Sequence, residues 1–242
     1  MNNTPALLTR RFALILVLGW GSISHAAAQQ TPPSDAARQQ LAQAGIPFTE
    51  QAFLAYCEGG DQAVVALFLE AGMSPDATDQ AQQTALIHAA YEGHADLVQR
   101  LLAAGADANH ADRHAATALM YATSEGHADV VQQLLQAGVE VNRQDAFHGW
   151  TALMYAAFEG HPKIVQQLIE AGAEVDRSEQ QGGYTALHYA AFQGYPNVVR
   201  VLIRAKAKVN AKNLLGSTAL ALASSRGFDK VARLLTRAGA EQ

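Results

Sequence analysis

Apolar residues follow two alternating patterns along most of the chain, and both are visible in residues 151–175. The first pattern is a run of small and apolar residues that begins at Thr151, a residue type that caps helix N-termini. The second, at residues 164–169, places apolar side chains three and four positions apart, which is the spacing of one face of an α-helix. A glycine follows each run (Gly160 and Gly172), as is typical of a helix end that needs a left-handed residue. The pattern therefore predicts two antiparallel helices followed by a turn.

The unit is repeated along the chain. Near copies begin at five threonines, which are separated by 33, 34, 34 and 33 residues: Thr84, Thr117, Thr151, Thr185 and Thr218. A sixth unit begins at Gln51 and has apolar residues where we expect a core: Phe53, Ala55, Val64, Val65, Phe68 and Leu69. Self-similarity at a fixed period predicts a stack of small units, because one unit cannot bury its own apolar face.

Residues 185–190, Thr-Ala-Leu-His-Tyr-Ala, resemble the T-P-L-H-x-A signature of the ankyrin repeat family, with alanine at the proline position. The resemblance implies an all-α fold, an ankyrin-repeat solenoid of about six helix-turn-helix repeats. We expect repeats one to six at residues 51–83, 84–116, 117–150, 151–184, 185–217 and 218–242. Residues 35–50 predict an N-terminal helical cap over the exposed end of the stack, after a linker at residues 29–34.

The first 28 residues have the order of a secretory signal peptide: Arg10 and Arg11, an apolar run at residues 12–20, and small residues before a cleavage site at Ala28. The apolar run is shorter than the ~20 residues that span a bilayer, so we expect no membrane-spanning segment after signal removal. The chain thus resembles bacterial exported ankyrin-repeat proteins, with a periplasmic or secreted mature form. An N-terminus retained in the cytosol is the alternative, and these residues do not distinguish Sec from twin-arginine export.

Charge divides the chain into two parts. Residues 29–194 contain 6 Lys/Arg and 20 Asp/Glu, a net of −14, whereas the residues from Tyr195 onward contain 9 and 2, a net of +7. The division either serves solubility alone or creates a dipole that steers the approach of a partner. Nucleic acid is not an expected partner, because the body is acidic and the N-terminus indicates export. One cysteine, Cys57, excludes an internal disulfide, and we expect it to be a buried thiol.

Histidines at one slot of successive repeats raise the question of a metal site: His94, His127 and His161. Stacked helices lie ~8–10 Å apart, whereas the ligands of one zinc ion converge to ~2 Å from it, so these three cannot share a metal. The family resemblance implies instead that they form an internal hydrogen-bonding scaffold. No nucleophile elbow, phosphate loop or zinc motif is present in the sequence. We therefore expect no catalytic residue, no metal and no cofactor.

A candidate binding surface follows from the resemblance, which implies that turn tips and first helices form a concave groove. Aromatic residues on this mapped groove gather at repeats four and five: Phe147, Trp150, Phe158, Tyr184 and Phe192. One acidic residue per repeat forms a ladder beside them: Glu92, Glu125 and Glu159. Such a combination is typical of binding hot spots, and mutual stacking between adjacent repeats is the alternative. The tyrosines that follow the core leucines are assigned to the core: Tyr121, Tyr155 and Tyr189.

These features predict a non-catalytic protein-protein interaction scaffold in the bacterial periplasm, which binds a protein partner through the concave groove. A dedicated inhibitor, an immunity protein or a stress-protective partner of one secreted enzyme is the alternative, and a metal-dependent enzyme is less favoured. The identity of the partner and the oligomeric state are not specified by the residues.

Three positions depart from the repeat pattern. Lys206 stands where the other second helices end in glycine, and Gln82 and Ala115 stand where later turns have glycine. A non-glycine residue in the left-handed region costs ~1 kcal/mol or more. We therefore predict either strain or a different helix end at Lys206, and altered tips in the turns at Gln82 and Ala115.

Overall fold

The computed structural model describes residues 33–241. The predicted signal peptide, with Ala28, lies outside the described residues, as does most of the predicted linker. The described part contains thirteen α-helices and no β-strand. They are α1 (Pro33–Gln43), α2 (Glu50–Glu58), α3 (Gln62–Glu70), α4 (Ala85–Glu92), α5 (Ala95–Ala103), α6 (Ala118–Ser124), α7 (Ala128–Gln136), α8 (Ala152–Glu159), α9 (Pro162–Glu170), α10 (Ala186–Gln193), α11 (Pro196–Arg204), α12 (Ala219–Ser225) and α13 (Asp229–Arg237).

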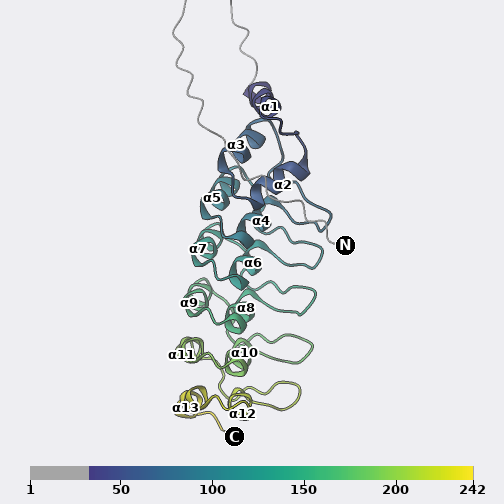
Figure 1. Ribbon diagram of the computed structural model, residues 1–242. Coiled ribbons are helices and arrows are strands. Elements are labelled where there is room, and N and C mark those ends of the chain that lie inside the picture. The colour runs from purple at the N-terminus through teal and green to yellow at the C-terminus, as the bar shows by residue number, and fades with distance from the viewer. Residues whose placement is uncertain (1–32, 242) are drawn as a thin grey trace, which may run out of the picture. The chain divides into compact units, whose positions relative to one another are not determined.

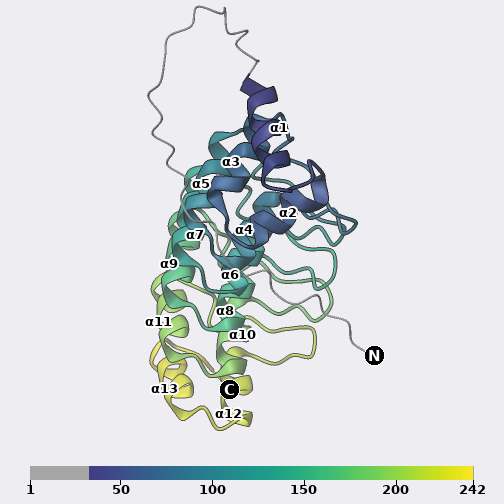
Figure 2. The ribbon, with the colours of Figure 1, turned by 45° about the horizontal axis from the view of Figure 1, so that its top comes forward.

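The helices form six antiparallel pairs, α2 with α3 through α12 with α13, which are repeats one to six (Figure 1). First helices pack on first helices from α2 to α12, and second helices pack on second helices from α5 to α13. Figure 2 shows the same two columns of helices, with the turns projecting from the column of first helices. The all-α solenoid is confirmed.

The first repeat is covered by α1, which packs against α3. Ala37 and Leu41 of α1 are buried, and the Arg38 Nε–H donates to the carbonyl oxygen of Ala71 at 3.0 Å, beyond the end of α3. Helix α1 begins at Pro33, two residues before the range predicted for the N-terminal helical cap (residues 35–50), and ends at Gln43. No helix among residues 33–241 combines the length and apolar character needed to cross a membrane.

A threonine directly precedes each first helix, as the sequence predicted for Thr151. The Thr151 Oγ1 accepts a hydrogen bond from the backbone N–H of Met154 at 3.3 Å, and Thr84, Thr117 and Thr218 cap their helices in the same way. In repeat one the capping residue is Thr49, two positions before Gln51, and it accepts from the N–H of Ala52. Each such cap contributes ~1 kcal/mol.

The core consists of the apolar helix faces that the sequence predicted, except that one residue was assigned to it wrongly. Repeat four buries the expected residues of both helices: Leu153, Ala156, Ala157, Ile164, Val165 and Leu168. Ala55 of repeat one is exposed, however, and the prediction that it lies in the core was wrong. The buried face of α2 consists of Phe53, Leu54 and Cys57, and Ala55 lies ~200° around the helix from Phe53, because each residue turns ~100°.

Neighbouring repeats interlock through rings that lie on glycines. The His127 ring occupies the space beside Gly93, where a Cβ would come within 2.5 Å of its Nδ1, and the Nε2–H donates to the carbonyl oxygen of Tyr91 at 2.9 Å. His94 and His161 make the same contact with Gly60 and Gly126 and donate to the preceding repeat. The predicted hydrogen-bonding scaffold is confirmed for these three histidines.

The three departures from the glycine pattern all have left-handed backbones. Lys206 has φ 64°, so its helix ends as the others do and carries the strain of a side chain in that region. Gln82 has φ 61° and Ala115 has φ 57°, close to the 70° of Gly149 in a later turn. The expectation of altered tips at Gln82 and Ala115 was therefore wrong.

Candidate partner-binding surface

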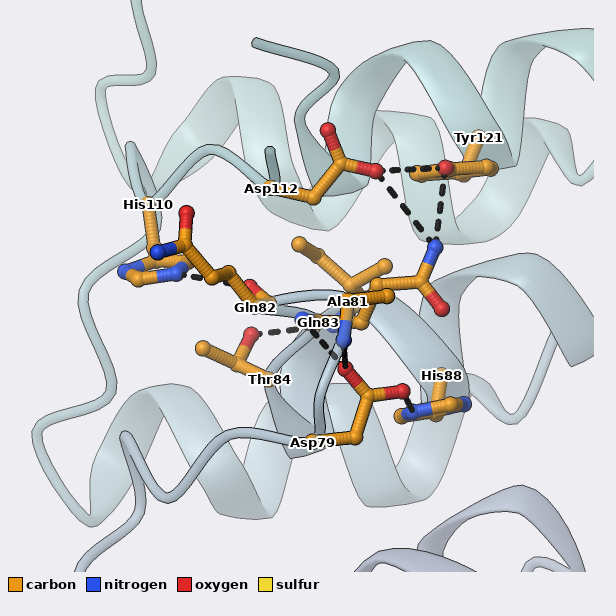
Figure 3. Close-up of polar contacts among 10 residues, drawn as sticks. Asp79, Ala81, Gln82, Gln83, Thr84, His88, His110, Asp112 and Tyr121 are labelled. Carbon is orange, nitrogen blue, oxygen red and sulfur yellow. Dashed lines mark hydrogen bonds and ion pairs between the residues drawn. The ribbon is translucent and has the colours of Figure 1, made fainter. Parts of the chain in front are cut away.

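Each turn that joins one repeat to the next is held by one carboxylate or amide side chain. The Asp79 Oδ1 accepts hydrogen bonds from the backbone N–H groups of Ala81 (2.7 Å) and Gln83 (2.9 Å), as Figure 3 shows. The same role falls to one residue in each later turn: Asp112, Asp145, Glu179 and Asn213. These bonds explain why Gln82 can hold a left-handed backbone, because Asp79 holds the residues before and after it, Ala81 and Gln83.

The turn that enters repeat four is longer than the one that enters repeat three. Thr151 follows Asp145 by six positions, whereas Thr117 follows Asp112 by five, so one of the 34-residue spacings arises here. The Asp145 carboxylate accepts from the backbone N–H groups of Phe147 (2.7 Å) and Trp150 (2.9 Å). The Phe147 side chain is left 66% exposed at the tip.

The tyrosines assigned to the core lie at its edge instead. Tyr121 and Tyr155 are half-buried, and their hydroxyl groups donate to the carboxylates of Asp112 at 2.7 Å and Asp145 at 3.2 Å. Tyr189 is also half-buried. The assignment to the core was wrong, because each ring is only partly buried and packs against the edge of the core.

Burial, the hydrogen bond to Asp112 and the charge of that carboxylate raise the pKa of Tyr121 to about 12. Burial and the nearby Asp145 carboxylate raise the pKa of Tyr155 above its ordinary value. Both hydroxyl groups are therefore neutral donors near pH 7. The Gln83 Nε2 donates in turn to the Tyr121 oxygen at 2.9 Å, which links the turn that enters repeat two to the first helix of repeat three (Figure 3).

A cavity of about 360 Å³ lies between the first helices and turns of repeats two to four. Four aromatic rings line it: Tyr91, Tyr121, Phe147 and Tyr155. Its polar and titratable side chains include two carboxylates and two imidazoles: Glu125, Asp145, His114 and His148. We call this the tyrosine cavity.

Beside the tyrosine cavity, Trp150 is the centre of an aromatic cluster that spans repeats three to five. Its ring centroid lies 4.5 Å from Tyr189, 5.0 Å from Phe158 and 5.1 Å from Tyr155. Tyr184 joins the cluster by stacking on Tyr189 at 5.3 Å. The inter-repeat stacking that the sequence left as an alternative is thus present, while partner binding by these half-buried rings stays a prediction.

The other predicted surface residues are distributed around these two features. Phe147 and Glu125 line the tyrosine cavity, whereas Glu92 lines a separate depression with Tyr91. Glu159 is exposed. Phe192 is covered by the guanidinium of Arg226, which lies 4.0 Å from its ring centroid.

The sequence prediction missed most of the cavity wall, chiefly Tyr91, Tyr121, Tyr155, His114 and His148. The available signal was the repeated tyrosine four positions after each capping threonine of repeats three and four, which was read as a core position. Hydrogen bonding of its hydroxyl to a turn carboxylate was not visible from the spacing alone.

Metal and thiol chemistry find little support in the part of the chain that the structure describes. No group of three or more His, Cys, Asp or Glu side chains there could hold a metal ion. Cys57 is buried, and burial raises the pKa of its thiol to about 12, so it is not a reactive thiolate.

Comparison with known families gives one match, a model described as ankyrin repeats in three copies, over residues 52–145, 114–179 and 153–242. A search of curated proteins gave no match. Ankyrin repeats indicate a protein-protein interaction scaffold, and proteins built from them are in general non-catalytic modules. On the repeat geometry and this match over most of its length, the chain belongs to the ankyrin repeat family.

Proposed function

We propose that the protein is a non-catalytic scaffold of the bacterial periplasm that holds a protein partner on the turns and first helices of repeats two to five. The observation that carries the proposal is the exposed Phe147 ring, which lies at the rim of the tyrosine cavity. An exposed aromatic anchor beside a concave, largely aromatic surface is the arrangement found at the centre of protein interfaces.

The surroundings of Phe147 support the same conclusion. Its ring lies 4.5 Å from His148, whose ring is 4.9 Å from Trp150, so the exposed anchor continues into the Trp150 cluster. The hydrogen bonds from the turn to Asp145 hold the tip in one conformation. A rigid anchor loses little conformational entropy when it binds, which favours affinity.

Export to the periplasm is proposed from the charge, apolar and small-residue order of residues 1–28. Cell fractionation of a tagged protein tests it separately: the account expects a shortened form in the periplasmic fraction. A full-length form in the cytosol would contradict export without affecting the binding surface.

Photo-crosslinking in the native host tests the surface. The residue p-benzoylphenylalanine is placed at Phe147 or, as a matched control, at Leu215, which follows its turn residue Asn213 by two positions and is 80% exposed. The proposal expects one protein to be crosslinked from position 147 and not from position 215. No crosslink from position 147, or the same products from both positions, would contradict it.

A further inference from the structure

The tyrosine cavity differs from an ordinary apolar pocket in the charge around it. Asp145 is only 4% exposed and Asp112, which receives the Tyr121 hydroxyl, is 5% exposed. Among residues 33–241 neither carboxylate forms an ion pair, since both are held by backbone N–H groups and tyrosine hydroxyls. Of these two carboxylates only that of Asp145 lines the cavity, and Glu125 adds a second carboxylate at the wall. The cavity therefore combines aromatic faces with uncompensated negative charge.

We propose that the tyrosine cavity receives an arginine side chain of the bound protein partner. The inference rests on the proposed function and adds the chemistry of the residue that enters the surface. The volume of about 360 Å³ is at the lower end for ligand sites, which suits one side chain better than a folded segment.

Aromatic faces attract a guanidinium through their quadrupoles, and arginine stacks on them at a smaller cost of dehydration than lysine. The Tyr91 and Tyr121 rings meet at 82° with centroids 6.0 Å apart, so they form two walls of a corner. Tyr155 contributes a third ring from repeat four, and Phe147 contributes a fourth from the turn.

The polar atoms of the wall also favour a donor. The Tyr155 hydroxyl gives its proton to Asp145, so its oxygen keeps an acceptor site, whereas the Tyr121 oxygen already accepts from the Gln83 Nε2–H. A guanidinium has five N–H donors and no acceptor. His114 and His148 are the two wall residues that could carry positive charge, and no Lys or Arg of residues 33–241 lines the cavity.

The chain itself uses this interaction at its other end. Arg226 precedes Gly227 in repeat six, the slot that Glu125 occupies before Gly126 in repeat three. Its guanidinium lies 4.0 Å from the Phe192 centroid and 5.7 Å from that of Phe228. Repeat six thus supplies its own arginine to the aromatic faces, whereas at the tyrosine cavity the same slot is acidic and the cation must come from outside.

The test is an NMR titration of the ¹⁵N-labelled protein at pH 8 with three capped pentapeptides, Gly-Gly-X-Gly-Gly, in which X is arginine, its neutral isostere citrulline, or leucine. The proposal expects millimolar binding of the arginine peptide, with shifts centred on residues 121–125 and 145–148. Citrulline is expected to bind about threefold to thirtyfold more weakly, the range of a cation-π contact.

Two charge-neutral variants locate the site. Glu125→Gln is expected to weaken binding of the arginine peptide about threefold and to leave binding of the citrulline peptide unchanged, as loss of one exposed carboxylate implies. Glu159→Gln is the matched control, because Glu159 occupies the same slot of the next repeat outside the cavity. It is expected to have no effect.

Equal binding of arginine and citrulline, tighter binding of leucine, shifts centred elsewhere, or equal effects of the two variants would each overturn the inference. So would an absence of shifts at 20 mM peptide (about twenty times a dissociation constant of 1 mM). The photo-crosslink from Phe147 is independent of this titration. A crosslink without arginine binding would refute only the proposal that an arginine enters the cavity. Arginine binding without a crosslink would refute the proposal that a protein partner binds at Phe147.

Discussion

Repeats two and three and the last two repeats share one backbone plan but differ in charge, interlock and cavity. Residues 84–150 contain 3 Lys/Arg and 8 Asp/Glu, whereas residues 195–241 contain 9 and 2. The first region interlocks through His127 on Gly93, with a hydrogen bond to the preceding repeat. The second interlocks through Phe228 on Gly194, an apolar ring in the same slot. The space beside the glycine that ends each first helix thus takes a flat ring from the next repeat, while the polarity of that ring varies between repeats.

The largest expected effect comes from filling a glycine slot. Gly93→Ala places a Cβ within 2.5 Å of the His127 ring at a φ of 78°. We expect a loss of about 2–5 kcal/mol in the free energy of unfolding, from left-handed strain and overpacking together. Urea denaturation followed by circular dichroism measures it.

Gly227→Ala is the control in the last repeat, where φ is 74° and nothing lies within 4 Å of the added Cβ. Its expected cost is the strain alone, about 1–2 kcal/mol. Equal costs at the two positions would show that the ring contact is unimportant.

Exchange of the two ring types is expected to give effects of opposite sign. His127→Phe leaves the carbonyl oxygen of Tyr91 without its donor and should cost about 1–3 kcal/mol. Phe228→His offers the carbonyl of Phe192 a donor in the equivalent slot and should stabilise the protein by about 1 kcal/mol. Thermal and urea unfolding measure both variants, and a change in the same direction for both would break the comparison.

His188 makes the fifth repeat sensitive to pH. Burial lowers the pKa of His188, whose Nδ1 accepts from the Thr185 N–H and whose Nε2–H donates to the Ala211 carbonyl oxygen. The unfolded chain therefore binds more protons below the ordinary value of 6.5, and stability falls as the pH drops from there toward the lower folded value. The slope from this group is at most ~1.4 kcal/mol per pH unit.

Urea unfolding between pH 7.5 and 5.5 tests the contribution of His188. The matched variant is His188→Met, because Met120 and Met154 occupy the same slot of repeats three and four. The variant should lose less stability than the parent over this range. An identical pH dependence of the two proteins would exclude His188 as the cause.

The smallest expected effect is at Lys206. Lys206→Gly relieves the strain of a side chain at φ 64° and should raise the free energy of unfolding. The expected net gain is about 0.5–1 kcal/mol, because the greater flexibility of glycine in the unfolded chain offsets part of the relief. The reverse change, Gly172→Lys at φ 91°, should cost about 1–2 kcal/mol. A lower melting midpoint for Lys206→Gly would contradict the strain.

The sequence was sufficient for the features that depend on local chemistry. The threonine spacing predicted the helix pairs, the capping role of Thr151 and the stripe of Ile164, Val165 and Leu168. Because the other second helices end in glycine, Lys206 was predicted to be either strained or part of a different helix end, and its φ of 64° decides for strain.

The tyrosine cavity was not predicted, because its wall depends on contacts between repeats. Tyr121 follows a buried leucine and is easily taken for a core residue, yet its hydroxyl reaches Asp112 in the turn. Tyr91 contributes from the preceding repeat, and Phe147 is presented by the one-residue extension of a turn. Neither the direction of a ring nor the volume left between three repeats follows from a period of 33 residues.

The central claim is that the tyrosine cavity needs a cation from the partner, and Glu125→Arg tests it most directly. This variant places in repeat three the residue that repeat six has at Arg226, so the cavity is expected to fill with the protein's own guanidinium. Glu159→Arg is the control with the same change of charge in the next repeat. We expect the photo-crosslink from Phe147 to be lost in Glu125→Arg and retained in Glu159→Arg. An undiminished crosslink in Glu125→Arg would refute the need for a cation from the partner.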